Sequence, residues 1–289
     1  MMVANAPRLP SMVSGCWPVV SLLPLAHATF RLEFAAPCIA QRIRPGQFIM
    51  LRLPQRTDPL LGRAFALYDT SLDAHGQPNQ VAIVFAVVGK MTRLMAALKP
   101  GDEVEAWGPL GQPFPDYSGV DHLVTIGGGI GQTPMLALLK RALGLKAYGG
   151  EPIKREVSKA SFYYGVRSAR LLAGLDDFAS TKASVHVATD DGSTGHHGLV
   201  TQLLEQQHNQ QADGQTRRWV GCGPEPMMHA LVRLAERVQV PLDLSLETPM
   251  ACGVGICFSC VTKVKTGNGW DYRRVCVEGP VFPADQLVW

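Results

Sequence analysis

The first part of the chain carries short apolar segments separated by turn sequences. Arg44-Pro45-Gly46-Gln47 and Lys99-Pro100-Gly101-Asp102 are turn sequences of this kind. A single helix is expected at about 91–98. Closely spaced short strands predict an antiparallel β-barrel over residues 1–115. The expected strands cover residues 19–23, 29–34, 47–53, 64–69, 81–88 and 103–107.

The hydrophobic pattern changes near residue 116. Continuously apolar strands, at 122–126, 161–164, 184–188, 218–220 and 241–245, now alternate with helical stretches. The helices are expected at 133–143, 169–178, 199–206 and 226–238. Buried strands alternating with helices predict a doubly wound α/β domain with a parallel sheet over residues 116–245.

Residues 246–289 contain too few apolar positions for a core of their own, so a bound metal is expected to hold this piece together. Four of the seven cysteines lie here: Cys252, Cys257, Cys260 and Cys276. Their spacing, C-x4-C-x2-C followed by fifteen residues and a last Cys, is that of plant-type [2Fe–2S] sites. The tail is therefore predicted to be a small [2Fe–2S] subdomain.

Zinc is the alternative for these thiols. Zinc sites usually use two C-x2-C pairs or a mixture of Cys and His. Only one C-x2-C is present here, and no His lies between Cys252 and Cys276. Gly253 and Gly255 allow backbone amides to turn toward inorganic sulfide, which also favours the cluster.

Three strand ends are candidates for a nucleotide site, because ligands of parallel sheets bind beyond the carboxyl ends of the strands. The first is the glycine-rich turn at 127–134, where a helix begins and where pyrophosphate can approach the backbone. The second is Asp190-Asp191, which can accept from ribose hydroxyls or simply shape a turn. The third is Cys222-Gly223-Pro224, where Cys222 faces a nicotinamide or is merely a small buried residue.

Composition narrows the setting. The chain is 46% hydrophobic and 18% charged, with a net charge of +3, too small to favour nucleic acid or an anionic membrane as partner. No apolar run is long enough to cross a membrane. Residues 13–26 are apolar but interrupted by Pro18 and Pro24, which favours a first barrel strand over a signal peptide. A cytoplasmic protein is expected.

In order along the chain, four segments resemble the ferredoxin–NADP reductase superfamily. They are Arg63-Ala64-Phe65-Ala66-Leu67, Gly89-Lys90-Met91-Thr92, the 127–134 turn and the 222–224 turn. The tail, from Glu247 to Cys260 and from Val275 to Phe282, resembles the electron-transfer subunits of two-subunit, NAD-dependent dihydroorotate dehydrogenases. On residues alone, Thr92 could equally be a helix cap and Arg63 a solvated strand end.

The resemblance implies an FAD site, an NAD(P)(H) site and a [2Fe–2S] site. In such relatives a catalytic subunit oxidises dihydroorotate at its FMN in pyrimidine biosynthesis, and electrons cross the cluster to FAD and NAD+. Two copies of each subunit assemble, and no acid–base catalytic pair is expected. The implied FAD residues are Arg63, Ala64, Phe65, Ala66, Val84, Phe85, Ala86, Met91 and Thr92. The implied NAD(P)(H) residues are Gly128, Gly129, Gly131, Thr133, Pro134, Asp190, Asp191, Cys222, Gly223 and Pro224.

Two positions depart from the family pattern. Ala66 stands where Ser or Thr often donates to the flavin, and Met91 stands where Gly is frequent and where a positive φ would strain it. Two alternatives remain open: a similar NAD(P)H reductase subunit serving a hydrogenase, sulfur reductase or transhydrogenase, and a zinc-stapled nucleotide-binding regulator.

Overall fold

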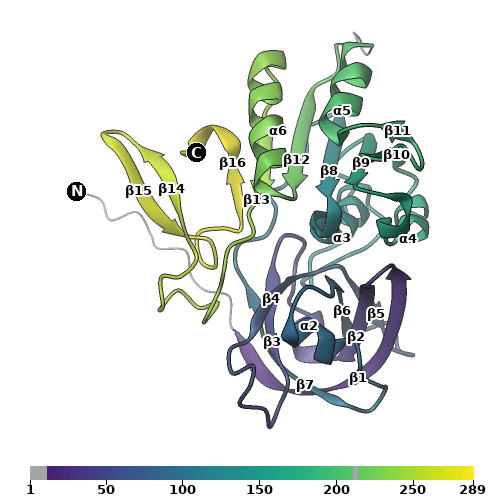
Figure 1. Cartoon of the computed structure of the whole chain (residues 1–289), viewed down its shortest axis with the longest axis vertical. Coiled ribbons are helices and arrows are strands. Elements are labelled where there is room, and N and C mark those ends of the chain that lie inside the picture. The colour runs from purple at the N-terminus through teal and green to yellow at the C-terminus, as the bar shows by residue number, and fades with distance from the viewer. Residues whose placement is uncertain (1–11, 211–213) are drawn as a thin grey trace.

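The computed structural model describes residues 12–210 and 214–289, so the first eleven residues of the predicted barrel domain lie outside the described part. The chain forms a β-barrel, an α/β domain and a C-terminal extension beside both (Figure 1). The predicted order of barrel, doubly wound sheet and tail is confirmed.

The barrel is a sheet of seven strands in which every neighbouring pair is antiparallel. Its edge strands β4 and β5 are joined only by Leu67 and Tyr68, so the two edges of the sheet come together. The helices are α1 (Pro37–Ala40) and α2 (Lys90–Met95). In spatial order the strands are β4 (Arg63–Ala66), β3 (Phe48–Arg52), β7 (Glu103–Leu110), β1 (Val13–Ala26), β2 (Thr29–Ala35), β6 (Pro78–Ala86) and β5 (Asp69–Leu72).

Strand β1 is much longer than the predicted segment 19–23. Its first half pairs with β7 and its second half with β2, so one continuous strand serves both sides of the barrel. The expectation that residues 13–26 form a first barrel strand is confirmed.

The second sheet also has seven strands, and its first six in spatial order run parallel. In spatial order they are β11 (His196–His197), β10 (Ser184–Thr189), β9 (Lys159–Val166), β8 (His122–Gly128), β12 (Arg217–Cys222), β13 (Leu242–Ser245) and β16 (Val281–Pro283). The helices are α3 (Thr133–Ala142), α4 (Leu175–Ala179), α5 (Val200–Asn209) and α6 (Glu225–Val238), with 3-10 turns η1 (Gly129–Gln132), η2 (Ala169–Leu171) and η3 (Ala284–Gln286).

Alternate residues of these strands feed two separate cores, as a sheet with period two requires. Tyr163 of β9 belongs to the cluster built with α5 and α6, whereas the neighbouring Phe162 belongs to the cluster built with α3 and α4. Helices therefore cover both faces of the sheet, which is the doubly wound arrangement.

The single helix predicted at 169–178 is wrong in part. The segment forms η2 and then α4, with a break between them. Gly174 at the break has φ of +73°, and a Cβ there would strike the hydroxyl of Tyr68 from the barrel. Gly174, in the left-handed region, precedes the first residue of α4 and packs closely against the barrel.

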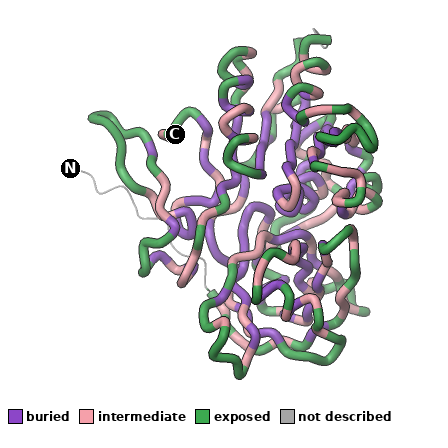
Figure 2. The backbone as a smooth tube through the Cα atoms, in the orientation of Figure 1, coloured by how far each residue is buried: buried purple, intermediate pink, exposed green. Residues whose placement is uncertain are grey.

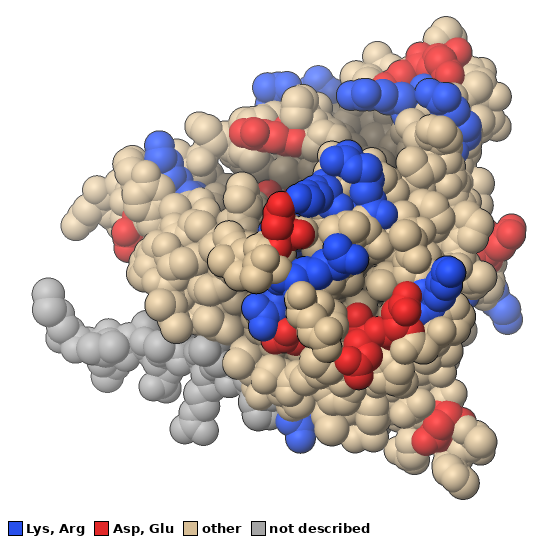
Figure 3. Space-filling view, turned by 60° about the horizontal axis from the view of Figure 1, so that its bottom comes forward, with Lys and Arg blue, Asp and Glu red and all other residues tan. Residues whose placement is uncertain are grey.

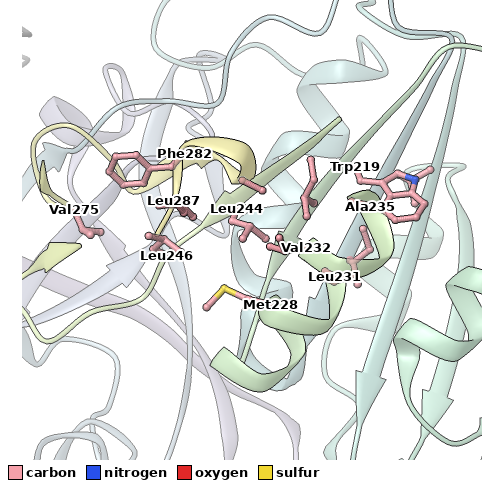
Figure 4. Close-up of a cluster of buried hydrophobic side chains, with 14 of the residues drawn as sticks. Trp219, Met228, Leu231, Val232, Ala235, Leu244, Leu246, Val275, Phe282 and Leu287 are labelled. Atoms are coloured by element: carbon pink, nitrogen blue, oxygen red, sulfur yellow. The ribbon is translucent and has the colours of Figure 1, made fainter. Parts of the chain in front are cut away.

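The C-terminal extension carries an antiparallel hairpin, β14 (Val261–Thr266) and β15 (Gly269–Arg274), and then returns to the second sheet. Its last strand, β16, pairs antiparallel with β13. Val275, Phe282 and Leu287 lie in one cluster with Met228 and Leu231 of α6 (Figure 4). The extension therefore shares a core with the α/β domain, while much of the hairpin stays exposed (Figure 2).

The surface carries charges of both signs. On the face shown in Figure 3, basic and acidic side chains lie intermixed, in keeping with the small net charge. In the described part of the chain, no helix has the length and apolar character needed to cross a membrane.

Candidate functional site

A pocket of about 510 Å³ lies where the barrel meets the α/β domain. Its walls come from β4, β6 and α2 of the barrel, from the start of α3, and from the loop that follows β13. Twelve predicted residues line it: Arg63, Ala64, Phe65, Ala66, Val84, Phe85, Ala86, Met91, Thr92, Thr133, Pro134 and Cys222. The structure thus brings every predicted FAD residue to one cavity.

Thr92 lines the pocket and also completes the start of α2. Its Oγ1 accepts hydrogen bonds from the backbone N–H of Val88 (2.9 Å) and of Gly89 (3.1 Å). These two donors therefore already have a partner within the protein. Thr92 fixes the shape of this corner of the pocket by satisfying helix-end donors.

The two departures from the family pattern have different consequences. Met91 is 3% exposed and packs in the barrel core, and it is not among the described residues with positive φ. The backbone strain that a positive φ would cause at Met91 is therefore absent. Ala66 does line the pocket, so that part of the wall lacks a hydroxyl group.

The glycine-rich turn combines tight packing with one open position. A Cβ on Gly131 would strike the carbonyl group of Cys222, and one on Gly128 would lie 2.5 Å from Sδ of Met227. Gly129 has φ of +55°, and a Cβ there would meet nothing within 4 Å. Close packing thus explains Gly128 and Gly131, and open space for a ligand remains at Gly129.

The remaining predicted nucleotide residues lie outside the pocket. Gly223 is packed so closely that a Cβ would lie 3.0 Å from backbone atoms of Gly128. Asp190 and Asp191 follow β10, two strands away from β8 but at the same carboxyl edge of the sheet. The Asp191 carboxylate accepts from the hydroxyl (2.5 Å) and N–H (2.9 Å) of Ser193, and these bonds lower its pKa. Both bonds go to Oδ1, so Asp191 shapes the turn that follows β10.

Sequence reasoning missed one wall of the pocket, formed by residues 245–250. Burial raises the pKa of the Cys222 thiol, which lies 3.9 Å from Oε1 of Glu247. Desolvation by the surrounding protein atoms also raises the pKa of the Glu247 carboxyl. The residue keeps an exposed surface, which faces the pocket. These residues follow the carboxyl end of β13, so the rule used for the other strand ends could have found them.

The four predicted cysteine ligands lie together beside this wall. Cys252 lies close to Cys257, and Cys260 lies close to Cys276. Among the described residues, no three His, Cys, Asp or Glu side chains surround one position for a single metal ion. Two pairs of thiols fit a cluster with two irons, each of which needs two protein ligands.

The backbone around these thiols also fits a cluster. The N–H of Val254 donates to Sγ of Cys252 (3.4 Å), and the backbone of Gly255 lies near the Cys276 sulfur. Positive φ at Gly253 (+73°) and Gly255 (+83°) turns the chain so that its amides face the sulfur atoms. Such donors stabilise the negative charge of thiolates and sulfides.

Comparison with known proteins agrees with this geometry. Three family models match: the oxidoreductase FAD-binding domain over residues 18–114, the oxidoreductase NAD-binding domain over 125–233, and the iron–sulfur cluster binding domain of dihydroorotate dehydrogenase B over 247–288. A dihydroorotate dehydrogenase B (NAD(+)) electron transfer subunit from Desulforamulus reducens is 35% identical, covering 94% of this chain and 97% of the relative. The corresponding Geobacillus thermodenitrificans protein is 36% identical, covering 93% and 96%.

One solved structure shows the same fold over the whole chain. It is an NADH-dependent reduced ferredoxin-NADP oxidoreductase, described in connection with flavin-based electron bifurcation. It is 24% identical, with a TM-score of 0.78, covering 100% of this chain and 92% of the other.

The fold, the pocket and the three domain matches define a flavin- and NAD-binding oxidoreductase with an iron–sulfur subdomain. More narrowly, the chain belongs to the family of electron transfer subunits of NAD-dependent dihydroorotate dehydrogenase B. The predicted cofactor classes FAD, NAD and iron–sulfur cluster are confirmed by these matches.

Proposed function

We propose that this chain carries electrons between NAD(H) and a catalytic subunit that oxidises dihydroorotate, by way of FAD and a [2Fe–2S] cluster, in pyrimidine biosynthesis. FAD supplies the exchange between two-electron hydride transfer and the one-electron steps of a cluster. The printed names of the relatives support the partner and the nucleotide.

One observation carries the proposal. The segment that lines the flavin pocket continues directly into the cluster loop, since Met250 is in the pocket wall and Cys252 follows two residues later. A short path between redox groups is what electron transfer requires. Both cofactor sites would therefore lie along one short stretch of backbone, which supports the proposed path.

The residues divide among three sites. Residues 63–66 and 84–86, with Met91 and Thr92, would hold FAD in the pocket. The nucleotide would bind at the glycine-rich turn, Asp190, Asp191 and the 222–224 turn, with Cys222 and Glu247 forming the wall near its reacting end. Cys252 with Cys257 and Cys260 with Cys276 would each hold one iron.

The assembly and location follow from the same family. We infer two copies of this chain with two catalytic subunits. Two observations support a location in the cytoplasm. None of the seven cysteines forms a disulfide, and the thiolates of a cluster must stay reduced.

Anaerobic purification and a visible spectrum, before and after NADH, test the cofactor path. Flavin bands and broad iron–sulfur absorption, both bleached by NADH, are expected. Addition of the dihydroorotate dehydrogenase catalytic subunit of the same organism should then give dihydroorotate-dependent reduction of NAD+. Bleaching without this coupled activity would mean that the chain serves another complex, and protein that stays colourless after reconstitution and binds zinc would contradict the proposal.

A further inference from the structure

Exposed aromatic side chains gather in the C-terminal extension. Phe258 (60% exposed), Trp270 (49%), Tyr272 (51%) and Trp289 (45%) are the exposed Phe, Trp and Tyr residues of the described part of the chain, and all lie in this extension. Large exposed aromatic groups are enriched in protein–protein interfaces. Their concentration in one small region therefore indicates a contact surface.

Two of these aromatic residues, Trp270 and Tyr272, share one face of the hairpin with two lysines. In the β14–β15 hairpin, Lys263 lies opposite Tyr272 and Lys265 opposite Trp270, so these four side chains share one face. The Lys263 ammonium lies 4.6 Å from the Trp270 ring centroid, and the rings of Trp270 and Tyr272 are 5.2 Å apart. We call Lys263, Lys265, Trp270 and Tyr272 the basic–aromatic face.

The opposite face of the hairpin is turned toward the protein. Val264 is buried there and forms a bridge with Leu287. The hairpin is thus anchored through Val264, while all four side chains of the basic–aromatic face are exposed.

The basic–aromatic face continues to the cluster loop. Arg274 follows Trp270 and Tyr272 on the same side of β15, and its guanidinium lies 5.4 Å from the Phe258 ring. Phe258 and Ile256, which is 78% exposed, flank Cys257. Cys257 is the one proposed ligand of the four that is exposed, so this surface surrounds the point where electrons can leave the cluster.

The charge on this surface is positive. Among the described residues, neither Lys263 nor Lys265 takes part in an ion pair, whereas the nearby Asp271 and Glu278 are already paired with Arg273 and Arg274. A complementary partner would present carboxylates opposite the lysines and apolar recesses opposite the rings.

We propose that the catalytic subunit docks on the basic–aromatic face together with Ile256 and Phe258. The rings of Trp270 and Tyr272 would be buried in the interface. Lys263 and Lys265 would attract acidic groups of the partner. This inference rests on the proposed function, because it takes the catalytic subunit as the occupant. It adds which surface is used and which chemistry the partner must offer.

The test is titration calorimetry of the FAD- and cluster-loaded protein with the dihydroorotate dehydrogenase catalytic subunit of the same organism. Trp270→Ala with Tyr272→Ala should weaken binding at least tenfold. Lys263→Glu with Lys265→Glu should also weaken it and reduce its salt dependence. Lys99→Glu and Leu72→Ala, both exposed on the barrel, are the matched controls and should bind like the unsubstituted protein.

NADH-driven bleaching of flavin and cluster is measured in parallel. It should be unchanged in all four variants, because none of these residues lies in the pocket or among the cysteines. Normal bleaching with unweakened binding in both hairpin variants would overturn the docking surface and leave the proposed function standing. Absence of binding by the unsubstituted protein would overturn both.

Discussion

The indole Nε1 of Trp107 donates a hydrogen bond to the carbonyl oxygen of Cys252, 3.1 Å away. Trp107 belongs to barrel strand β7, and Cys252 is the first of the four clustered cysteines. The loop that would hold the cluster is therefore fastened to the flavin-binding barrel as well as to its own sheet. This contact helps to fix the distance between the flavin pocket and the cysteine loop.

Gly253 should not tolerate a side chain. Its φ is +73°, and a Cβ would lie 2.5 Å from Cγ of Met50 on β3. Gly253→Ala is expected to lower iron and sulfide content severalfold, while FAD content stays near one per chain. Gly267→Ala, in the hairpin turn where a Cβ meets nothing within 4 Å, is the control. Equal iron content in the two variants would contradict the close fit of this loop.

Loss of one cysteine ligand should remove the cluster without removing the flavin. Cys276→Ser is expected to abolish the iron–sulfur absorption and to leave the flavin bands bleached by NADH. Electron delivery to the catalytic subunit should then fall at least a hundredfold. Cys38→Ser, which changes an exposed cysteine in α1, should leave both spectra intact. A Cys276→Ser protein with full cluster absorption would show that this residue is not a ligand.

Arg274 joins the two halves of the cysteine set. It forms an ion pair with Glu278 (2.6 Å) beyond Cys276, and its Nη1 donates to the carbonyl oxygen of Gly255 (3.2 Å) between the other cysteines. Arg274→Gln should therefore make cluster loss in air several times faster. The rate is measured as the decay of visible absorption. Arg273→Gln, whose partner is the exposed Asp271, should decay like the unsubstituted protein. Equal decay rates would mean that Arg274 does not organise the site.

Asp69 connects the two large domains. Its carboxylate accepts from Lys140 (2.6 Å) of α3, and also from Lys146 (2.6 Å) and Tyr148 (2.8 Å) in the following loop. Asp69→Asn leaves two largely buried ammonium groups without their counterion, so we expect a loss of about 3 kcal/mol in unfolding free energy. Urea denaturation measures it, and Asp176→Asn, an exposed position, should change it by less than about 0.5 kcal/mol.

The same carboxylate predicts a pH dependence. Burial raises the pKa of Asp69, but Lys146 and Lys140 more than offset this and hold the pKa below 3.8. A lowered carboxyl pKa contributes stability that is present above the unfolded value, near 3.8, and is lost as the pH falls toward the folded value. The difference in stability between the unsubstituted protein and Asp69→Asn should therefore shrink as the pH is lowered below about 4. A constant difference would argue against this linkage.

The sequence predicts the elements whose signals are local. The glycine-rich turn, the cysteine spacing and the alternation of strands with helices all lie within short windows, and the structure bears out the fold that they indicate. Strand β16 was missed because a three-residue strand carries no periodicity and exists only through its pairing with β13. Gly174 at the break packs against Tyr68, more than a hundred residues away, and no local pattern reports such a contact.

The candidate site shows the same division. Residues 63–66 and 84–86, with Met91 and Thr92, were expected at a cofactor and do line one pocket. The wall formed by residues 245–250 contains no glycine-rich turn, so no local motif marks it as part of a site. Asp191 correctly marks a strand end, and Oδ1 of its carboxylate accepts hydrogen bonds from Ser193.

The pairing of Ser245 with Val281 has a wider meaning for the architecture. The chain leaves the α/β sheet at Ser245 and comes back to the adjacent strand at Val281, so the whole intervening stretch is an insertion between two hydrogen-bonded neighbours. The entropy cost of closing a loop grows only slowly with its length, so a stretch this long between two paired strands costs little more than a shorter one. The same stretch supplies one wall of the flavin pocket and places Val275 in one core cluster with α6. The cluster loop is therefore built into the sheet and the pocket at once, and its two ends fix where it stands on the sheet.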